Sequence, residues 1–249
     1  MRLIVFPILA VLGCASTAQA AVIPDCAGAV EIRNAHVVRV ERNGALILTD
    51  GRALLLEGIR LADTTLNGAA LDALRDLALH APVTFTATPP KEDRYDRVRA
   101  QAFSSVWLQT ALLEQGLARV EIAPDRSECS PELYEAENRA RSKHLGIWAN
   151  AAYAPRPPEA VKGATGSFQL VDGWVTNVGS GGGRVFIDFG SNGQHSFSAV
   201  IAPEDRRAFR GYDLDGLHAR HIRIRGIVQD YKGRPEIALS NPAQIEILN

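Results

Sequence analysis

The chain has 249 residues, of which 46% are hydrophobic, so a disordered protein is excluded and one or two folded domains are expected. Its 27 lysines and arginines stand against 28 aspartates and glutamates, for a formal net charge of -1. This balance excludes nucleic-acid binding driven by bulk charge, so any such binding requires a local basic patch.

Residues 1–20 have the pattern of a secretory signal peptide. Arg2 precedes an apolar run over 3–12, and an Ala-Gln-Ala cleavage site ends at Ala20. The run is too short to span a bilayer, which needs about 20 apolar residues. The sequence therefore predicts an exported protein, periplasmic or secreted, with no transmembrane segment. A loose lipoprotein box ending at Cys14 leaves a lipid anchor open as the alternative.

Two cysteines, Cys26 and Cys129, remain in the exported chain. In an oxidising compartment such a pair suggests a disulfide that ties the N-terminal segment to the loop before a helix. Metal binding is the weaker alternative, because neither cysteine has a second cysteine or a histidine at ligand spacing. We predict the disulfide and no metal site.

The first domain is predicted over 28–150 as an α+β unit, with strands first and helices packed on them. Asn43-Gly44 and Asp50-Gly51 are hairpin signals between the first strands. Apolar residues at helical spacing predict a helix that Pro82 ends. The predicted strands are 28–41, 45–49, 53–59, 83–87 and 98–103, and the predicted helices are 66–80, 106–115 and 131–145.

Prolines at 155, 157 and 158 mark a linker over 151–163, which we expect to be stiff and extended. The second domain, 164–249, shows short strands with one short helix in the middle. The predicted strands are 168–178, 184–189, 195–201, 221–231, 236–239 and 244–248, and the helix is 204–209. This order fits a small all-β, five-stranded barrel of the oligonucleotide-binding kind.

Three segments of the first domain resemble the thermonuclease family, which has the staphylococcal-nuclease-like fold. They are LLLEGIRLAD at 54–63, DRYDRVRAQAF at 93–103 with LLEQGLARV at 112–120, and AENRARSKHLGIW at 136–148. The resemblance covers roughly residues 30–150 and implies a five-stranded barrel, similar to the oligonucleotide-binding kind, with packed helices. It also implies a phosphodiesterase whose carboxylates hold a metal ion and whose arginines neutralise the phosphate.

Aligned on Gly58-Ile59, the chain keeps little of the catalytic set that the resemblance implies. Arg97 alone occupies its family position with its family residue type. The acidic turn falls on 42–45, the strand arginine on Leu55, the metal-binding aspartate on Arg60 and the glutamate on Asp63. A cation at a metal position repels calcium, which needs several oxygen ligands. Calcium is therefore expected only if a nuclease survives that uses Arg97 and Asp63.

Other interpretations of these residues stay open. A rival register places Arg52 and Glu57 at the strand arginine and aspartate positions, but it breaks the Gly-Ile match. Arg97 and Asp93 also fit a simple salt bridge within their loop. Asp63 equally fits a cap for the helix that follows it, and Glu57 is expected on an exposed turn or strand face.

The second domain offers a possible nucleic-acid site. Strand alternation sends His221, Arg223 and Arg225 to one face and the isoleucines between them to the core. Bases could stack on aromatic residues near such a basic stripe, and we name Trp174, Phe186 and Tyr231 as candidates. The alternative is that the aromatics belong to the core and the arginines pair with Asp172, Asp188 or Glu236.

These observations favour an exported scaffold that binds single-stranded nucleic acid or an envelope protein, with little or no catalysis and no cofactor. A metal-dependent nuclease acting on DNA or RNA is the first alternative. A purely structural envelope protein is the second, and the sequence points to no particular oligomeric state.

Overall fold

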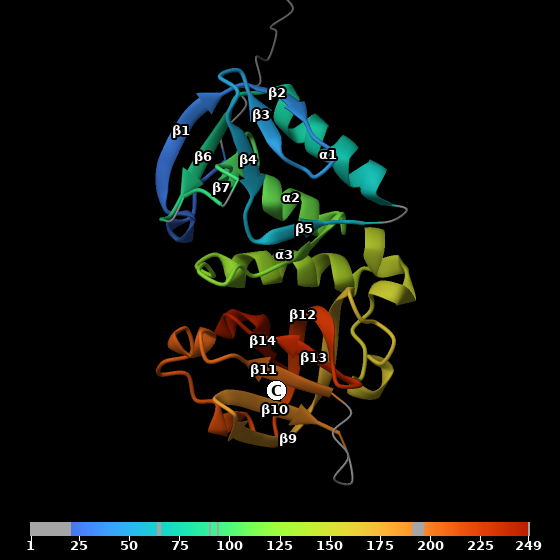
Figure 1. Cartoon of the computed structure of the whole chain (residues 1–249). Helices are drawn as coiled ribbons and strands as arrows, with labels where there is room; N and C mark the ends of the chain where they lie inside the picture. Colours follow the sequence, from blue (N-terminus) through green and yellow to red (C-terminus); the bar gives the residue numbers. More distant parts are fainter. Residues whose placement is uncertain (1–20, 64–65, 90, 94, 191–196, 249) are drawn as a thin grey trace, which may run out of the picture.

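The computed structural model describes residues 21–63, 66–89, 91–93, 95–190 and 197–248. The predicted signal peptide and lipoprotein box lie outside these residues. No helix within the described ranges is long and apolar enough to cross a membrane. In Figure 1 the first domain lies above and the second domain below, with one helix lying across the junction between them.

The strands of the first domain are β1 (Ala29–Ala35), β2 (Val37–Val40), β3 (Leu46–Leu48), β4 (Ala53–Leu56), β5 (Ile59–Leu61), β6 (Val83–Ala87), β7 (Val98–Phe103) and β8 (Ala118–Val120). One sheet runs in the order β1-β6-β7-β4-β3-β2, and β5 pairs with β8 beside it. β4 and β7 are parallel neighbours. The two edge strands of this sheet, β1 and β2, are consecutive in the chain, and only His36 separates them. The predicted α+β class with packed helices is confirmed.

Two strands that the sequence predicts as continuous are each divided in two. The predicted strand 28–41 is divided at His36 into β1 and β2, just after Asn34, which has a left-handed φ of 50° within β1. Gly58, with φ 81°, lies in the turn between β4 and β5. A Cβ on Gly58 would lie 2.6 Å from the side chain of Leu133, so both the turn and the packing require glycine.

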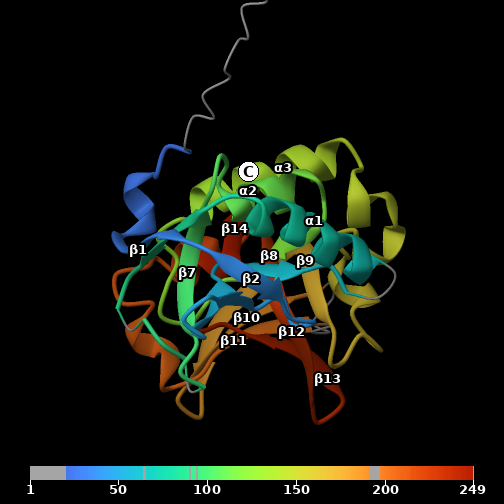
Figure 2. The ribbon, with the colours of Figure 1, turned by 90° about the horizontal axis from the view of Figure 1, so that it is seen from above.

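The helices of the first domain are α1 (Asn67–Leu79), α2 (Leu108–Glu114) and α3 (Ser130–Ser142). Leu71, Leu74 and Ala78 bury one face of α1, which accounts for its helical periodicity. Pro131 stands in the first turn of α3, where its missing N–H is tolerated. Figures 1 and 2 place α3 directly against the second domain.

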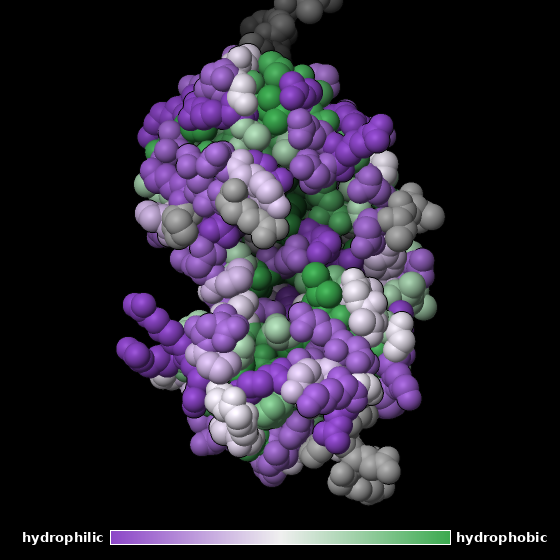
Figure 3. Space-filling model, viewed as in Figure 1, coloured by the Kyte–Doolittle hydropathy of each residue, from purple (hydrophilic) through white to green (hydrophobic). Residues whose placement is uncertain are grey.

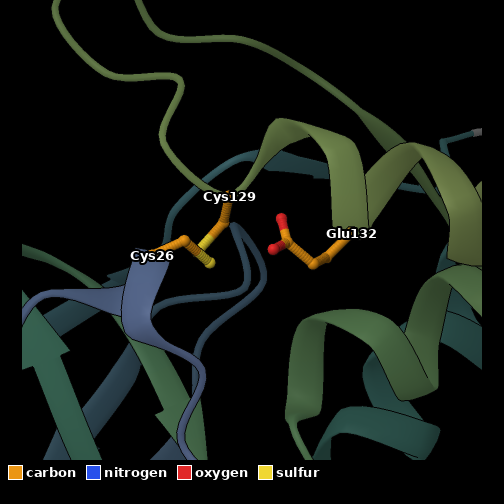
Figure 4. Close-up of side chains that lie close together, drawn as sticks. All are labelled: Cys26, Cys129 and Glu132. Carbon is orange, nitrogen blue, oxygen red and sulfur yellow. A yellow bond between two sulfur atoms is a disulfide. The ribbon is translucent and has the colours of Figure 1, made fainter.

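The predicted disulfide is present. Cys26, in the short 3-10 helix Asp25–Ala27, is bonded to Cys129, the residue before α3. Figure 4 shows the Glu132 carboxylate beside this bond. The sulfurs are bonded to each other, so they do not form a thiolate metal site with Glu132.

The strands of the second domain are β9 (Phe168–Gly181), β10 (Arg184–Phe189), β11 (Phe197–Ile201), β12 (His221–Tyr231), β13 (Arg234–Ala238) and β14 (Ile245–Ile247). Their order is β13-β11-β10-β9-β12-β14, and β12 also pairs with β13. The pairing therefore runs in a ring through β9 to β13, with β11 and β13 parallel. Asp205–Arg207 is a 3-10 helix where a short helix is predicted. The assignment to the oligonucleotide-binding kind stays a prediction.

The segment between the domains is packed and partly helical, where the sequence predicts an extended linker. Ala151–Tyr153 and Pro158–Ala160 are short 3-10 helices. Between them the backbone of Arg156 donates to Leu170 O and accepts from Asp172 N, each at 2.9 Å. The prolines therefore set turns that hold this segment against β9.

A buried arginine joins the two domains. Arg225 of β12 is 1% exposed, and its Nη2 lies 3.0 Å from Glu137 Oε2 of α3, whose side chain is fully buried. Its Nη1 donates to Val120 O at 3.0 Å, and its guanidinium stacks 4.2 Å from the Tyr134 ring centre. Burial alone would lower the pKa of Arg225, but Glu137, Tyr134 and Glu246 raise it above its ordinary value. The guanidinium is charged, and both of its terminal nitrogens donate hydrogen bonds at the junction.

Reduction of the disulfide tests its contribution to stability. The bond closes a loop between cysteines 103 residues apart, so we expect reduction to lower the free energy of unfolding by about 4 kcal/mol. Urea unfolding of the oxidised and reduced protein measures the difference, and Cys26→Ser/Cys129→Ser should match the reduced form. An unchanged unfolding midpoint would contradict this role.

Candidate functional site

The first domain has an open cleft at the positions that the thermonuclease resemblance marks as catalytic. Its volume is about 350 Å³, and we call it the first-domain cleft. Leu55 and Arg60 line it, together with Asp63 and the turn at residues 42–44. The cleft of the resemblance is therefore present, with a different set of side chains.

Arg60 is the residue of the cleft that stands at the expected metal position. It lies on β5, and its Nη2 is 3.3 Å from Glu121 Oε1 in a half-exposed ion pair. Its guanidinium also stacks on Phe168, at the start of β9, with Cζ 5.6 Å from the ring centre. The carboxylate of Glu121 is therefore neutralised by an arginine of the cleft, and a second-domain ring contacts that arginine.

Asp63 is held by residues outside the cleft. Tyr153 Oη donates to Asp63 Oδ1 at 2.8 Å, and Arg119 Nη2 lies 3.3 Å from Asp63 Oδ2. Arg119 is buried and stacks on both Tyr153 and Phe168, with Cζ 5.0 Å from each ring centre. Burial lowers the pKa of Arg119, and Asp63 only partly offsets this. Both carboxylate oxygens of Asp63 are thus committed to contacts that fix the inter-domain segment.

Arg97 lies in a separate cluster. Its Nε and Nη2 donate to Asp93 Oδ2 at 2.9 and 2.7 Å, and its guanidinium stacks on Tyr95. Arg97 does not line the first-domain cleft. Burial acts to raise the pKa of Asp93, but hydrogen bonds from Arg97 and from two backbone N–H groups outweigh it and hold that pKa below its ordinary value. This geometry matches the simple loop salt bridge, and no contact brings Arg97 and Asp63 together within the described residues.

The predicted basic stripe on β12 is not a free surface. Ile222 and Ile224 point into the core, as alternation predicts. Arg223 and Arg225 share the opposite face, but they are only 7% and 1% exposed, and Arg225 is in contact with Val120 and Glu137 of the first domain. Arg223 pairs with Asp172 at 2.6 Å, which is the alternative that the sequence left open. The expectation of an exposed stripe is wrong for both arginines.

Trp174 and His221 lie at the outer end of that face. They are cross-strand neighbours whose rings stack with 5.2 Å between centres. Trp174 is 58% exposed, which is unusual for an aromatic side chain of this size. A role of this pair in nucleic-acid binding stays a prediction.

Phe186 and Tyr231 are brought together on a different face of the second domain. The Arg184 guanidinium stacks on both rings, with Cζ 5.2 Å from Phe186 and 4.8 Å from Tyr231. Arg184 also pairs with Glu236 at 2.6 Å, and Lys232 Nζ lies 5.3 Å from the Tyr231 ring centre. Phe186, Tyr231, Lys232 and Glu236 border a cavity of about 450 Å³, which we call the aromatic pocket, and Arg184 contacts three of these side chains. The sequence reasoning missed Arg184 and Lys232, although each stands within two residues of a named aromatic residue.

The side chain of Glu57 is largely covered, which corrects the expectation that it lies on an exposed turn or strand face. Its Oε2 accepts from Arg126 Nη1 at 2.8 Å, and both side chains are at most 9% exposed. Burial raises the pKa of Glu57, against the opposing effect of Arg126. The pair lines a small cavity behind the disulfide, of about 20 Å³, which is enough for one water molecule.

The Asp93–Arg97 pair gives a pH-dependent prediction. We expect Asp93→Asn to lower the free energy of unfolding by about 1 kcal/mol at pH 7. Because the folded-state pKa of Asp93 is depressed, this stabilisation exists above the unfolded pKa and is lost as pH falls through the folded one. Urea unfolding across that range measures it. Asp72→Asn, in an exposed pair on α1, is the control, and we expect less than about 0.5 kcal/mol from it. A loss that is equal at every pH would contradict this assignment.

Comparisons with known proteins agree with this architecture for the first domain. Residues 67–150 match the family model described as staphylococcal nuclease homologue. The matched segment runs from the start of α1 to the residue after the 3-10 helix Gly146–Ala149, and it begins after Asp63, the last cleft position of the resemblance. A search of the curated proteins found no match. The chain therefore carries a thermonuclease-like domain, related to the staphylococcal nuclease homologues.

Proposed function

We propose that the protein is an exported scaffold that binds single-stranded nucleic acid and does not hydrolyse it with a metal ion. The observation that carries the proposal is Arg60, which stands in the first-domain cleft at the expected metal position and pairs with Glu121. The disulfide and the absence of a membrane-spanning helix among the described residues are compatible with export.

The electrostatics of the cleft disfavour a hard cation. Calcium takes six to eight oxygen ligands, which in a protein come from several carboxylates, carbonyl groups and waters together. Here Glu121 is neutralised by Arg60, and Asp63 by Arg119. An arginine about 4 Å from a divalent ion would repel it by several kcal/mol at an intermediate effective dielectric. The side chains of this cleft therefore suit an anion or a neutral group better than a metal ion.

The aromatic pocket supports nucleic acid as the ligand. Phe186 and Tyr231 lie side by side with the Arg184 guanidinium stacked on both rings. Tyr231 is nevertheless 47% exposed, so the exposed part of its ring offers a surface on which a base can stack. Lys232 and Arg234 are exposed at its rim, and neither has a carboxylate partner within the described residues. Free cations beside aromatic rings are the combination that binds single strands without reading their sequence.

The metal-dependent nuclease is the alternative, and the match to the staphylococcal nuclease homologues favours it. In this alternative Arg97 and Asp63 would contribute to catalysis with bound calcium. Arg97 is bound to Asp93, and both oxygens of Asp63 have other partners. These contacts would have to break before either residue could act on a phosphate. A purely structural envelope protein is a third candidate, which predicts neither cleavage nor binding.

The proposal predicts binding without cleavage. We expect the mature protein to leave labelled single-stranded DNA intact with calcium or magnesium, and to retain it on a filter in a salt-dependent manner. Tyr231→Ala should weaken retention about tenfold through lost stacking, whereas Tyr95→Ala removes an exposed tyrosine of the first domain and should not. Cleavage that disappears in Arg97→Ala establishes the nuclease instead.

Titration calorimetry with calcium tests whether the first-domain cleft holds a metal ion. We expect no heat of calcium binding from the wild type. Arg60→Asp is the matched variant, because it groups a new carboxylate with Asp63 and Glu121, and we expect weak calcium binding in this variant only. Calcium binding by the wild type that Asp63→Asn abolishes would overturn the proposal.

A further inference from the structure

We infer that one nucleic-acid strand crosses both domains, from the aromatic pocket to the first-domain cleft. This inference rests on the proposed function and adds the path of the ligand. The path links three cavities that we together call the junction groove. They are the aromatic pocket, a cavity of about 170 Å³ at the domain junction, and the first-domain cleft. Figure 3 shows the surface hollowed where the two domains meet.

The cavities are neighbours through shared or paired residues. Glu121 lines both the first-domain cleft and the junction cavity. Gln229 lines the junction cavity and is the cross-strand partner of Glu236, which lines the aromatic pocket. Ile227 and Gln229 are two and four residues before Tyr231 on β12, so all three lie on one face of the strand. The outward face of β12 therefore forms the floor of the junction groove between the aromatic pocket and the junction cavity.

The fixed ion pairs leave the groove with free positive charge at both ends. Arg60 neutralises Glu121 in the cleft, and Arg184 neutralises Glu236 at the pocket. Asp188 of the pocket is 8% exposed and accepts hydrogen bonds from Asn177 and Ser198. Arg42 at the cleft end, like Lys232 and Arg234 at the pocket end, is exposed with no carboxylate partner within the described residues. Cations at both ends suit a polyanion that spans the distance between them.

The middle of the groove is apolar and amide-lined. Ile227 is 41% exposed and pairs across the strands with Phe168, and Gln229 and Gln244 flank them. Apolar side chains and amides accept the faces and edges of bases without a net charge. From Tyr231 along β12 to Ile227, across to Phe168 and on to Arg60, the path is about 25 Å long. At about 3.4 Å per stacked nucleotide this corresponds to roughly seven nucleotides.

Length-dependent binding tests this path. Fluorescence anisotropy with labelled oligo-dT of about 4, 8 and 16 nucleotides should give an affinity that rises from the first to the second length and then levels off. Ile227→Glu places a negative charge on the floor of the groove, and Arg42→Ser removes the cation at its far end. We expect each to weaken binding of the 8-nucleotide strand about fivefold and to leave the 4-nucleotide strand unaffected. Arg42→Ser should also reduce the slope against log salt by about 0.7.

The control is Arg75→Ser, which removes an exposed arginine of α1 outside the groove and should change neither affinity. If Tyr231→Ala abolishes binding but Ile227→Glu and Arg42→Ser leave the 8-nucleotide affinity unchanged, the site is confined to the second domain. That result overturns the inference and leaves the proposed function intact. If the protein binds none of the three oligonucleotides, which is the result expected of a protein whose ligand is a peptide, both the inference and the proposed function are overturned.

Discussion

Arg225 and Glu137 meet between the two domains, where neither side chain reaches water. Taking two charges out of water is unfavourable by several kcal/mol per ion, and the attraction within the pair offsets this only with the help of further hydrogen bonds. Both terminal nitrogens of Arg225 and both carboxylate oxygens of Glu137 have hydrogen-bond partners. Glu137 Oε1 also accepts from Val120 N, and Tyr134 covers the guanidinium. Removing one partner would leave the other charged and buried. The relative placement of the domains therefore depends on this contact, since few other arrangements could satisfy both groups.

The same placement determines what the first-domain cleft can do. With the second domain held on α3, Phe168 lies against Arg60 and Arg119, and Tyr153 reaches Asp63. The positions that carry catalysis in the resemblance thus serve as contacts between a thermonuclease-like domain and its neighbour. The junction groove is a product of the same contact, because its floor on β12 continues from Arg225. Fold and proposed ligand path follow from one docking geometry.

Local sequence signals predicted the elements well, because they reflect local chemistry. Asn43-Gly44 marked a hairpin, Leu71 and Leu74 marked α1, and alternation placed Ile222 and Ile224 in the core of the second domain. The export context predicted the disulfide.

Alternation also put Arg223 and Arg225 on one face, but it does not say what covers that face. Glu137 lies 88 residues away along the chain, so no local pattern links it to Arg225. The pairing of Asp63 with Tyr153, 90 residues away, could not be predicted for the same reason. The long predicted first strand is divided at His36, two residues after Asn34, whose left-handed backbone the alternation pattern does not show.

The most direct measurement is the unfolding of the Glu137→Ala variant, followed by tryptophan fluorescence and by circular dichroism. We expect the wild type to unfold in one transition. We expect the variant to lose about 3–5 kcal/mol of unfolding free energy and to show the second domain, reported by Trp174, unfolding separately. Glu135→Ala, which removes an exposed ion pair from the same helix, should change stability by less than about 0.5 kcal/mol. If the two variants behave alike, or the wild type already unfolds in two steps, the buried pair does not hold the domains together.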